Sequence, residues 1–287
     1  MTSKYCQGLS LLSFSIVCFM SIIVLSVMVD TLVMMQKSTL KLETKMTDQQ
    51  DLMLGATTLL HAIDQSSVFF CRTPILYQQM QFLVPDLTLS AVINQNAIEI
   101  YSHQSHYPSL LGLTKKGSGQ WVAGSDSLKV ETLKQSLSLS TPLLKGSQAV
   151  YLNARPRWKL GQLVLVDNCQ SLAVFRLIRV QRRRGGGTLL TLDRKSPFHF
   201  GVESSISLLT VTVFYIGKTT RKRADGIRIL ALYEKKLLGR RQEVVPNINQ
   251  LVIKALSVTP SIFSVALQGA TTENSWQIMV PRYAASL

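Results

Sequence analysis

The residues of this sequence that are best suited to chemistry are its histidines, its nucleophiles and its carboxylates. His103 and His106 could chelate a metal on a helix, but their Ser- and Gly-rich surroundings offer no third ligand. The Gly-Lys-Thr triplet at 217–219 lacks the first glycine of a phosphate-binding loop, because Thr212 stands there. No Gly-x-Ser-x-Gly motif occurs, and the 16 Asp and Glu form no evident pair. We therefore expect no catalytic residue, no metal and no cofactor, and predict that the chain is not an enzyme.

Positive charge is the strongest chemical signal. The chain has 31 Lys and Arg against 16 Asp and Glu, a formal charge of +15, which favours anionic partners such as phospholipid, nucleic acid or an acidic protein. The sequence places the basic clusters at turns but not on one face. They are either solvated hairpin tips or a rim that binds an anion such as DNA by neutralising its phosphates. The clusters are Arg182, Arg183 and Arg184, then Arg221, Lys222 and Arg223, then Lys235 and Lys236 with Arg240 and Arg241.

Charge is absent from one long stretch near the N-terminus. No charged residue occurs from Leu9 to Val29, and these 21 residues make about 30 Å of helix, which matches the hydrocarbon core of a bilayer. A cleaved secretory signal has a shorter apolar region and a small-residue cleavage site, and a buried core helix is rarely this long without charge. The sequence therefore predicts a transmembrane helix over residues 9–29.

The helix is expected to continue outside the membrane over residues 30–65. No proline interrupts this segment, and Gly55 is its only weak point. A seven-residue repeat is apolar at eight of ten positions, which indicates a seam that packs on other helices, or an ordinary amphipathic helix that covers a sheet in its second half. The repeat comprises Leu32, Met35, Thr39, Leu42, Met46, Gln49, Met53, Ala56, Leu60 and Ile63.

A β-rich head is expected over residues 66–287. Hydrophobic residues make up 46% of the chain and charged residues 16%, a composition that excludes disorder. The three glycines at 185–187 predict a hairpin tip, and residues 102–147 read as an irregular excursion. β-Branched and aromatic runs predict strands at 87–93, 97–101, 148–152, 162–167, 172–180, 188–193, 206–216, 228–233, 251–258, 262–267 and 276–280.

A long membrane helix followed by a mainly antiparallel β head suggests an α+β, pilin-like fold, and local sequence adds to this resemblance. Gly8 and Leu9, in Gly-Leu-Ser-Leu-Leu, resemble the junction of a class III prepilin leader, with residues 1–8 as the leader. Further stretches are similar to the PilW family of type IV pilus minor pilins. They are Phe69–Arg72, Gln162–Cys169, Phe200–Glu203, Val213–Thr219, Ala231–Tyr233 and Glu243–Ile248.

This resemblance implies a role in pilus assembly. Prepilin peptidase would cut after Gly8 and methylate the amine of Leu9, and the helix would hold the subunit in inner-membrane lipid with its head in the periplasm. The subunit would then enter a fimbrium at the cell surface, priming or capping assembly with other minor pilins and the major pilin. Alternatives are a basic tip pilin that binds DNA or an anionic surface, a type II secretion minor pseudopilin, and an unrelated signal-anchored envelope protein.

Two features depart from the pilin pattern. Pilins usually carry Glu at the fifth mature position, which here is Ser13, and an unpaired ammonium in hydrocarbon is costly. We therefore expect a position at or near the tip, although an altered family role is the other interpretation. Only Lys4 precedes the span while Lys37, Lys41 and Lys45 follow it, and the positive-inside rule would place the head in the cytoplasm.

The cysteines favour export of the head. Cys71 and Cys169 lie 98 residues apart, and a disulfide between them would stabilise the fold by roughly 4 to 5 kcal/mol if the periplasm oxidises it. The alternative is two buried free thiols. Cys6 would leave with the leader, and Cys18 lies in the predicted membrane helix.

Overall fold

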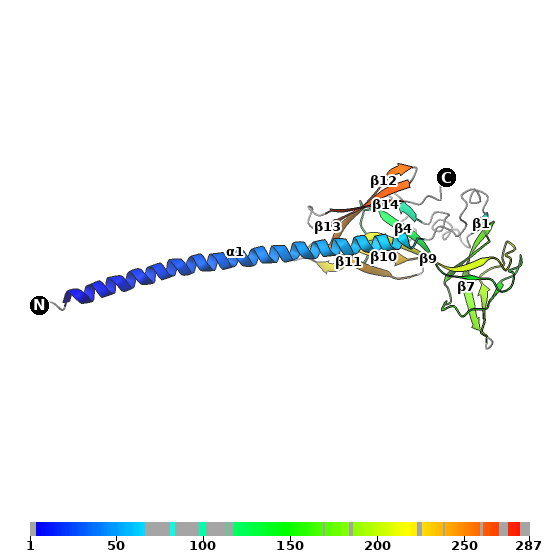
Figure 1. Cartoon of the computed structure of the whole chain (residues 1–287), viewed down its shortest axis with the longest axis horizontal. Helices are drawn as coiled ribbons and strands as arrows, with labels where there is room; N and C mark the ends of the chain where they lie inside the picture. Colours follow the sequence, from blue (N-terminus) through cyan, green and yellow to red (C-terminus); the bar gives the residue numbers. More distant parts are fainter. Residues whose placement is uncertain are drawn as a thin grey trace. The chain divides into compact units, whose positions relative to one another are not determined.

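The chain forms a long N-terminal helix and a mainly antiparallel β region (Figure 1). The computed structural model describes residues 4–66, 81–83, 98–101, 113, 117–168, 170–183, 186–222, 226–237, 239–258, 261–269 and 275–281. It divides into two compact units, Met1–Gln50 and Asp51–Leu287. We call them the N-terminal unit and the C-terminal unit. The boundary lies within the helix, so the last turns of the helix belong to the C-terminal unit.

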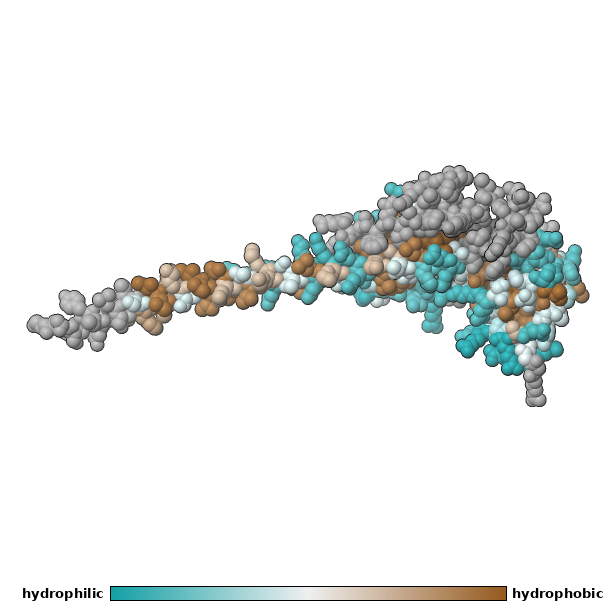
Figure 2. Space-filling view, in the orientation of Figure 1, coloured by the Kyte–Doolittle hydropathy of each residue, from teal (hydrophilic) through white to brown (hydrophobic). Residues whose placement is uncertain are grey.

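Helix α1 spans Lys4–Asp64 without interruption. Hydroxyl side chains inside it satisfy backbone carbonyls one turn earlier, as Ser21 does by donating to Val17 O at 2.8 Å, so they do not break the helix. In the N-terminal unit the apolar side chains of α1 are exposed, from 41% at Val33 to 75% at Met34. Figure 2 shows a largely apolar surface on the earlier stretch of this part of the helix and more polar residues toward its end. The predicted long helix is thereby confirmed.

The C-terminal unit contains two sheets in its described residues. The larger sheet has eleven strands in the order β11-β10-β9-β6-β7-β8-β5, with β1, β2, β3 and β4 joined beside this path, and every pair except β1–β7 is antiparallel. The smaller sheet is β12-β13-β14. The strands are β1 Gln81–Leu83, β2 Ile98–Tyr101, β3 Gln120–Trp121, β4 Ser127–Ser138, β5 Ala149–Leu152, β6 Leu163–Asp167, β7 Ser171–Arg182, β8 Thr188–Leu192, β9 Ser205–Lys222, β10 Arg228–Lys236, β11 Arg241–Pro246, β12 Ile248–Val258, β13 Ser261–Gly269 and β14 Ser275–Pro281.

The last turns of α1 cover one face of the large sheet. Leu52, Ala56, Leu59 and Ile63 are buried in one cluster with side chains of β2, β4, β9, β10 and the small sheet. The prediction that the second half of α1 covers a sheet is confirmed. The predicted repeat is wrong in detail, however, because Leu52 and Leu59 are buried, whereas Met53 is 55% exposed. The buried residues keep a spacing of seven, from Leu52 to Leu59 and from Ala56 to Ile63, so the predicted repeat has the right period and the wrong phase at Met53.

Two further clusters complete the core. On the other face of the large sheet, Tyr215 and Tyr233 pack with aliphatic residues of β6, β7 and β9. A third cluster lies mostly within residues 139–204, built on β5, β6, β7 and β8 around Phe175 and Phe200, and it includes Ile206 of β9. We call residues 139–204 the β7–β8 lobe, because the β7–β8 hairpin carries its basic tip.

Most predicted strands that fall on described residues are present, but residues 102–147 were wrongly predicted to be irregular. They contain β3 and the twelve-residue β4, which pairs along much of the eighteen-residue β9. Leu128 and Val130 of β4 are buried in the core, but Lys129 and Glu131, which alternate with them, are buried as well, and these charged residues obscured the alternation of the strand. β11 was also not predicted, and the strand expected at 87–93 lies outside the described residues.

Candidate functional site

The exposed apolar surface of α1 is the first candidate site. Among the described residues, one helix is long and apolar enough to cross a membrane, and its apolar window carries no buried residue. Gly8 and Leu9, the predicted leader junction, both lie in helical backbone. The free Cys18 is exposed on this helix. The length and composition of α1 suit a helix that anchors the chain in lipid.

The first basic cluster sits on the predicted hairpin between β7 and β8. The turn is closed by the Arg183 amide, which donates to Gly187 O at 2.9 Å, and by the Gly186 amide, which donates to Arg183 O at 3.2 Å. Gly186 has a φ of +100°, a conformation that glycine adopts without strain. Arg182 and Arg183 are exposed, and Arg184 lies outside the described residues. The hairpin prediction is therefore confirmed.

The second basic cluster differs because a carboxylate neutralises part of it. Arg221 lies at the end of β9 and forms an ion pair with Glu243 of β11, although both side chains are partly exposed. Lys222 is exposed at the same end of β9, and Arg223 lies outside the described residues. An exposed ion pair contributes little stability, but it lowers the net charge available to an anion.

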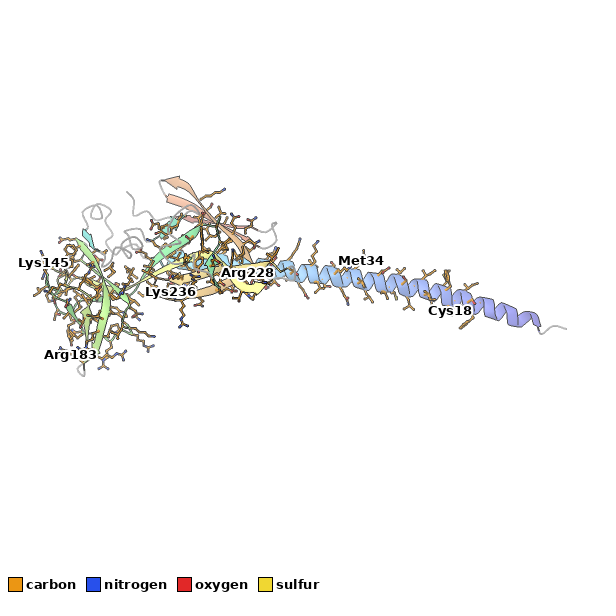
Figure 3. All side chains as sticks on the ribbon, turned by 180° about the vertical axis from the view of Figure 1, so that it is seen from behind. Cys18, Met34, Lys145, Arg183, Arg228 and Lys236 are labelled. Carbon is orange, nitrogen blue, oxygen red and sulfur yellow. The ribbon has the colours of Figure 1, made fainter. Side chains whose placement is uncertain are left out.

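The third basic cluster lies along the β10–β11 turn. Arg241 donates to the Gly119 carbonyl at 3.1 Å, and Lys236 Nζ lies 3.7 Å from Glu234 Oε1. Within the C-terminal unit, Figure 3 places Arg183 at one end and Arg228 at the other. Arg228, which is near the second cluster, lies beside the part of α1 that belongs to this unit. The structure therefore does not gather the basic clusters into one rim.

A pair of stacked tyrosines links the β9–β10 region to a glycine-rich loop. The rings of Tyr215 and Tyr233 lie 5.9 Å apart between centroids at 23°, and Tyr215 donates to Gly119 O at 2.9 Å. Burial is the main cause that raises the pKa of both phenols. A side chain at Gly217 would meet the Tyr233 ring at 2.8 Å, so this close packing requires glycine. Both groups stay protonated at neutral pH and serve the packing.

A buried ion cluster joins β2 to β4. Lys129 is fully buried, and its Nζ lies 2.9 Å from Glu131 Oε1 and 2.9 Å from Glu99 Oε2. Tyr101 also donates to Glu99 Oε2, at 2.5 Å. Sequence reasoning missed this cluster and the tyrosine pair. The polar–apolar alternation from Ser127 onward was a signal for a strand, but nothing local to β4 pointed to Glu99.

The remaining predicted site residues lie mostly outside the described residues. Cys71, Cys169, His103 and His106 all do, so the predicted disulfide stays a prediction. Within the part of the chain that the structure describes, no group of three His, Cys, Asp or Glu residues could hold a metal ion.

Comparisons with known proteins identify no family. No family model matches the chain, and no curated protein matches it. Among solved structures, the chain is similar in part to a phage phi92 endosialidase, with 12% identity, a TM-score of 0.20, and coverage of 56% of this chain and 32% of that protein. A likeness at this TM-score supports no conclusion about fold or function.

Proposed function

We propose that this chain is a membrane-anchored minor pilin that primes or caps assembly of a type IV pilus. The observation that carries the proposal is α1, a 61-residue helix that is uncharged from Leu9 to Val29 and ends packed on a β sheet. The resemblance of Gly8 and Leu9 to a prepilin junction adds to it. The role is architectural and uses no catalytic residue.

The apolar surface of α1 is longer than a membrane span needs. Beyond Val29, the N-terminal unit exposes Leu32, Met35, Leu42 and Met46 by 57% to 65%. Apolar side chains in such a row are unfavourable in water and favourable between packed helices. A filament core made of similar helices would cover them, which is why we favour a subunit that leaves the membrane for a polymer.

Ser13 bears on the position in the filament. Without a carboxylate at the fifth mature position, the subunit cannot neutralise the methylated amine of a neighbour in the apolar core. At the tip no such neighbour has to be served. We therefore place the subunit at or near the tip, in contact with other minor pilins through its β region.

The N-terminus of the mature protein provides the direct test. Mass spectrometry of the protein from its native membrane is expected to find N-methylated Leu9 as the first residue. The Gly8→Val variant is the matched control, because it should keep all eight leader residues. An intact Met1 in the unmodified chain would contradict the proposal.

A gene deletion separates the pilus role from its nearest alternative. Loss of the chain should reduce surface filaments while the major pilin accumulates in the inner membrane. A type II secretion minor pseudopilin would have the same helix, but its loss would impair protein secretion and leave piliation normal. Normal piliation therefore rejects the pilus role.

A further inference from the structure

We propose that the exposed face of the β5-β8-β7 sheet in the β7–β8 lobe binds the phosphodiester backbone of nucleic acid. This inference goes beyond the pilus role and does not require it. The proposed surface is one face of the β7–β8 lobe and not a rim of several clusters. Its principal cations are Arg179 and Arg183, and it does not include Arg221.

The β7–β8 lobe has a large excess of positive charge. Residues 139–204 contain eleven Lys or Arg and three Asp or Glu, a formal charge of +8. Of the three carboxylates, Asp167 is buried and Glu203 is exposed. Asp193 Oδ1 accepts a hydrogen bond from the backbone amide of Arg176 at 3.0 Å. Among the described residues of the lobe, no Lys or Arg lies within 4 Å of a carboxylate. Arg194 is partly buried and donates to Val174 O at 2.8 Å. The charge available to an outside anion therefore lies on exposed side chains such as Arg179 and Arg183.

The strand register puts these cations on an exposed face. Arg179 of β7 stands opposite Thr191 of β8, and Thr191 stands opposite Ala149 of β5. The next residues, Val180, Leu190 and Val150, pack into the third core cluster. Because successive side chains of a strand point to opposite sides, Arg179 faces away from that core. Arg176 lies on the same side, because it and Arg179 flank the bulge that follows buried Leu177, but Arg176 is only partly exposed and its Nε is buried.

Neighbouring side chains hold two of the guanidinium groups in place. Arg183 lies over the Tyr151 ring, 5.5 Å from its centroid. A side chain at Gly187 would meet the Tyr151 hydroxyl at 2.2 Å, so glycine is needed where this ring passes. The amide oxygen of Gln181, in the orientation that satisfies both groups, accepts from Arg179 Nη2 at 2.9 Å and Nε at 3.2 Å. Held arginines lose less conformational entropy when they bind an anion.

The nature of these groups favours phosphodiesters over other anions. Arg176, Arg179 and Arg183 are all arginines, whose planar guanidinium matches the paired oxygens of a phosphate. They are spread along β7 and the hairpin tip and do not converge on one point. An extended polymer with one charge per repeat fits this arrangement better than a single small anion.

The test is a binding titration with the full-length chain in a non-ionic detergent. The probe is a fluorescent single-stranded DNA of about 20 nucleotides, with a duplex of the same sequence as a second probe. Because phosphate binding releases counterions, we expect Kd to rise at least about tenfold between roughly 50 and 200 mM salt. We expect R179E/R183E to weaken binding by about tenfold or more and to lower the salt dependence by about one unit per arginine.

The matched control changes the same charge elsewhere in the C-terminal unit. K222E/R228E acts at the β9–β10 end, and should change Kd by less than about twofold. R179Q/R183Q, with near-ultraviolet circular dichroism as a check of folding, should weaken binding in the same direction. Equal losses in the two Glu variants, no DNA binding at low salt, or binding to anionic lipid nanodiscs but not to DNA would overturn the proposal.

Discussion

The two parts of α1 have similar apolar content and opposite surroundings. In the N-terminal unit, residues such as Phe14, Ile22 and Leu25 are exposed by 60% to 69%. In the C-terminal unit, Leu52 and Leu59 of the same helix are fully buried. One continuous helix thus presents one apolar surface that the chain itself covers and another that it leaves for lipid or for other helices.

This difference shows that the partner of a helix cannot be read from its composition alone. The covered part has Gly55 and Ala56 on its buried side, and these small residues let the sheet side chains approach. From Phe14 to Val29 the uncovered part has large exposed apolar residues and no charge, as expected for a helix in lipid.

The largest effect is expected from charges in the uncovered part. Ile22→Lys combined with Leu25→Lys should cost roughly 3 kcal/mol per lysine at the centre of a bilayer and should prevent stable membrane insertion. The measurement is the fraction of the chain that stays in membranes after carbonate extraction. Met53→Lys, on an exposed position of the covered part, is the control and should remain fully membrane-bound. Retention of the double variant would contradict a transmembrane role for this part.

The next largest effect is expected from a cavity under the covered part. Leu59→Ala should destabilise the C-terminal unit by about 2 to 5 kcal/mol, because Leu59 is fully buried in the cluster between α1 and the sheets. Met53→Ala should change stability by less than about 0.5 kcal/mol, since Met53 is exposed. Urea denaturation of the full chain in detergent, followed by near-ultraviolet circular dichroism, measures both. Equal losses would mean that the predicted repeat, and not the observed burial, identifies the contact.

Much of this organisation could be predicted from the sequence. The uncharged run from Leu9 to Val29 and the absence of proline fix the helix, because both signals are local. The same holds for the β7–β8 hairpin, where basic residues and glycines stand next to each other. The residues of α1 that face the sheet were predicted one position off at two sites, Leu52 and Leu59. The repeat was counted from Leu32, whereas the contact with the β region sets the phase.

The buried polar groups could not be predicted from the sequence. Lys129 is paired with Glu99, which lies 30 residues earlier, and Tyr215 with the carbonyl of Gly119, 96 residues earlier. Each pairing depends on which strands become neighbours. Because β4 carries Lys129 and Glu131 in buried positions, its composition resembles that of a loop until the pairing with β9 is known. The positive charge exposed in the β7–β8 lobe could not be predicted either, because it depends on how the strands pair and therefore on where the carboxylates lie.

A moderate effect is expected from overpacking the covered part. A Cβ at Gly55 would lie 3.2 Å from Leu267 Cδ1 and 3.7 Å from Leu232 Cδ2. Gly55→Leu should therefore destabilise the C-terminal unit by about 1 to 3 kcal/mol, despite a better helix propensity. Thr57→Leu is the control on the exposed side and should stay within about 0.5 kcal/mol of the original chain. The same urea denaturation assay measures both variants. A stabilised Gly55→Leu variant would show that the sheet lies further from α1.

The smallest effect on stability is expected from a substitution at Tyr215. Its dependence on pH distinguishes the C-terminal unit from the uncovered part of α1. Tyr215→Phe keeps the ring that stacks on Tyr233 but loses the hydrogen bond to Gly119, which should cost about 1 kcal/mol. Burial raises the pKa of Tyr215 above that of the unfolded chain, near 10, so folding favours the protonated phenol. Its contribution to stability is complete below about pH 10 and is lost as pH rises further toward the folded-state pKa.

The melting temperature of the C-terminal unit should therefore fall above about pH 10, and should fall less steeply in Tyr215→Phe. Residues 9–50 contain no tyrosine, so the helical signal of this part in detergent should outlast the near-ultraviolet signal of the sheets. If both signals are lost together at high pH, the covered and uncovered parts of α1 unfold as one. The helix would then depend on the sheets along its whole length, and not on lipid or detergent in its first half.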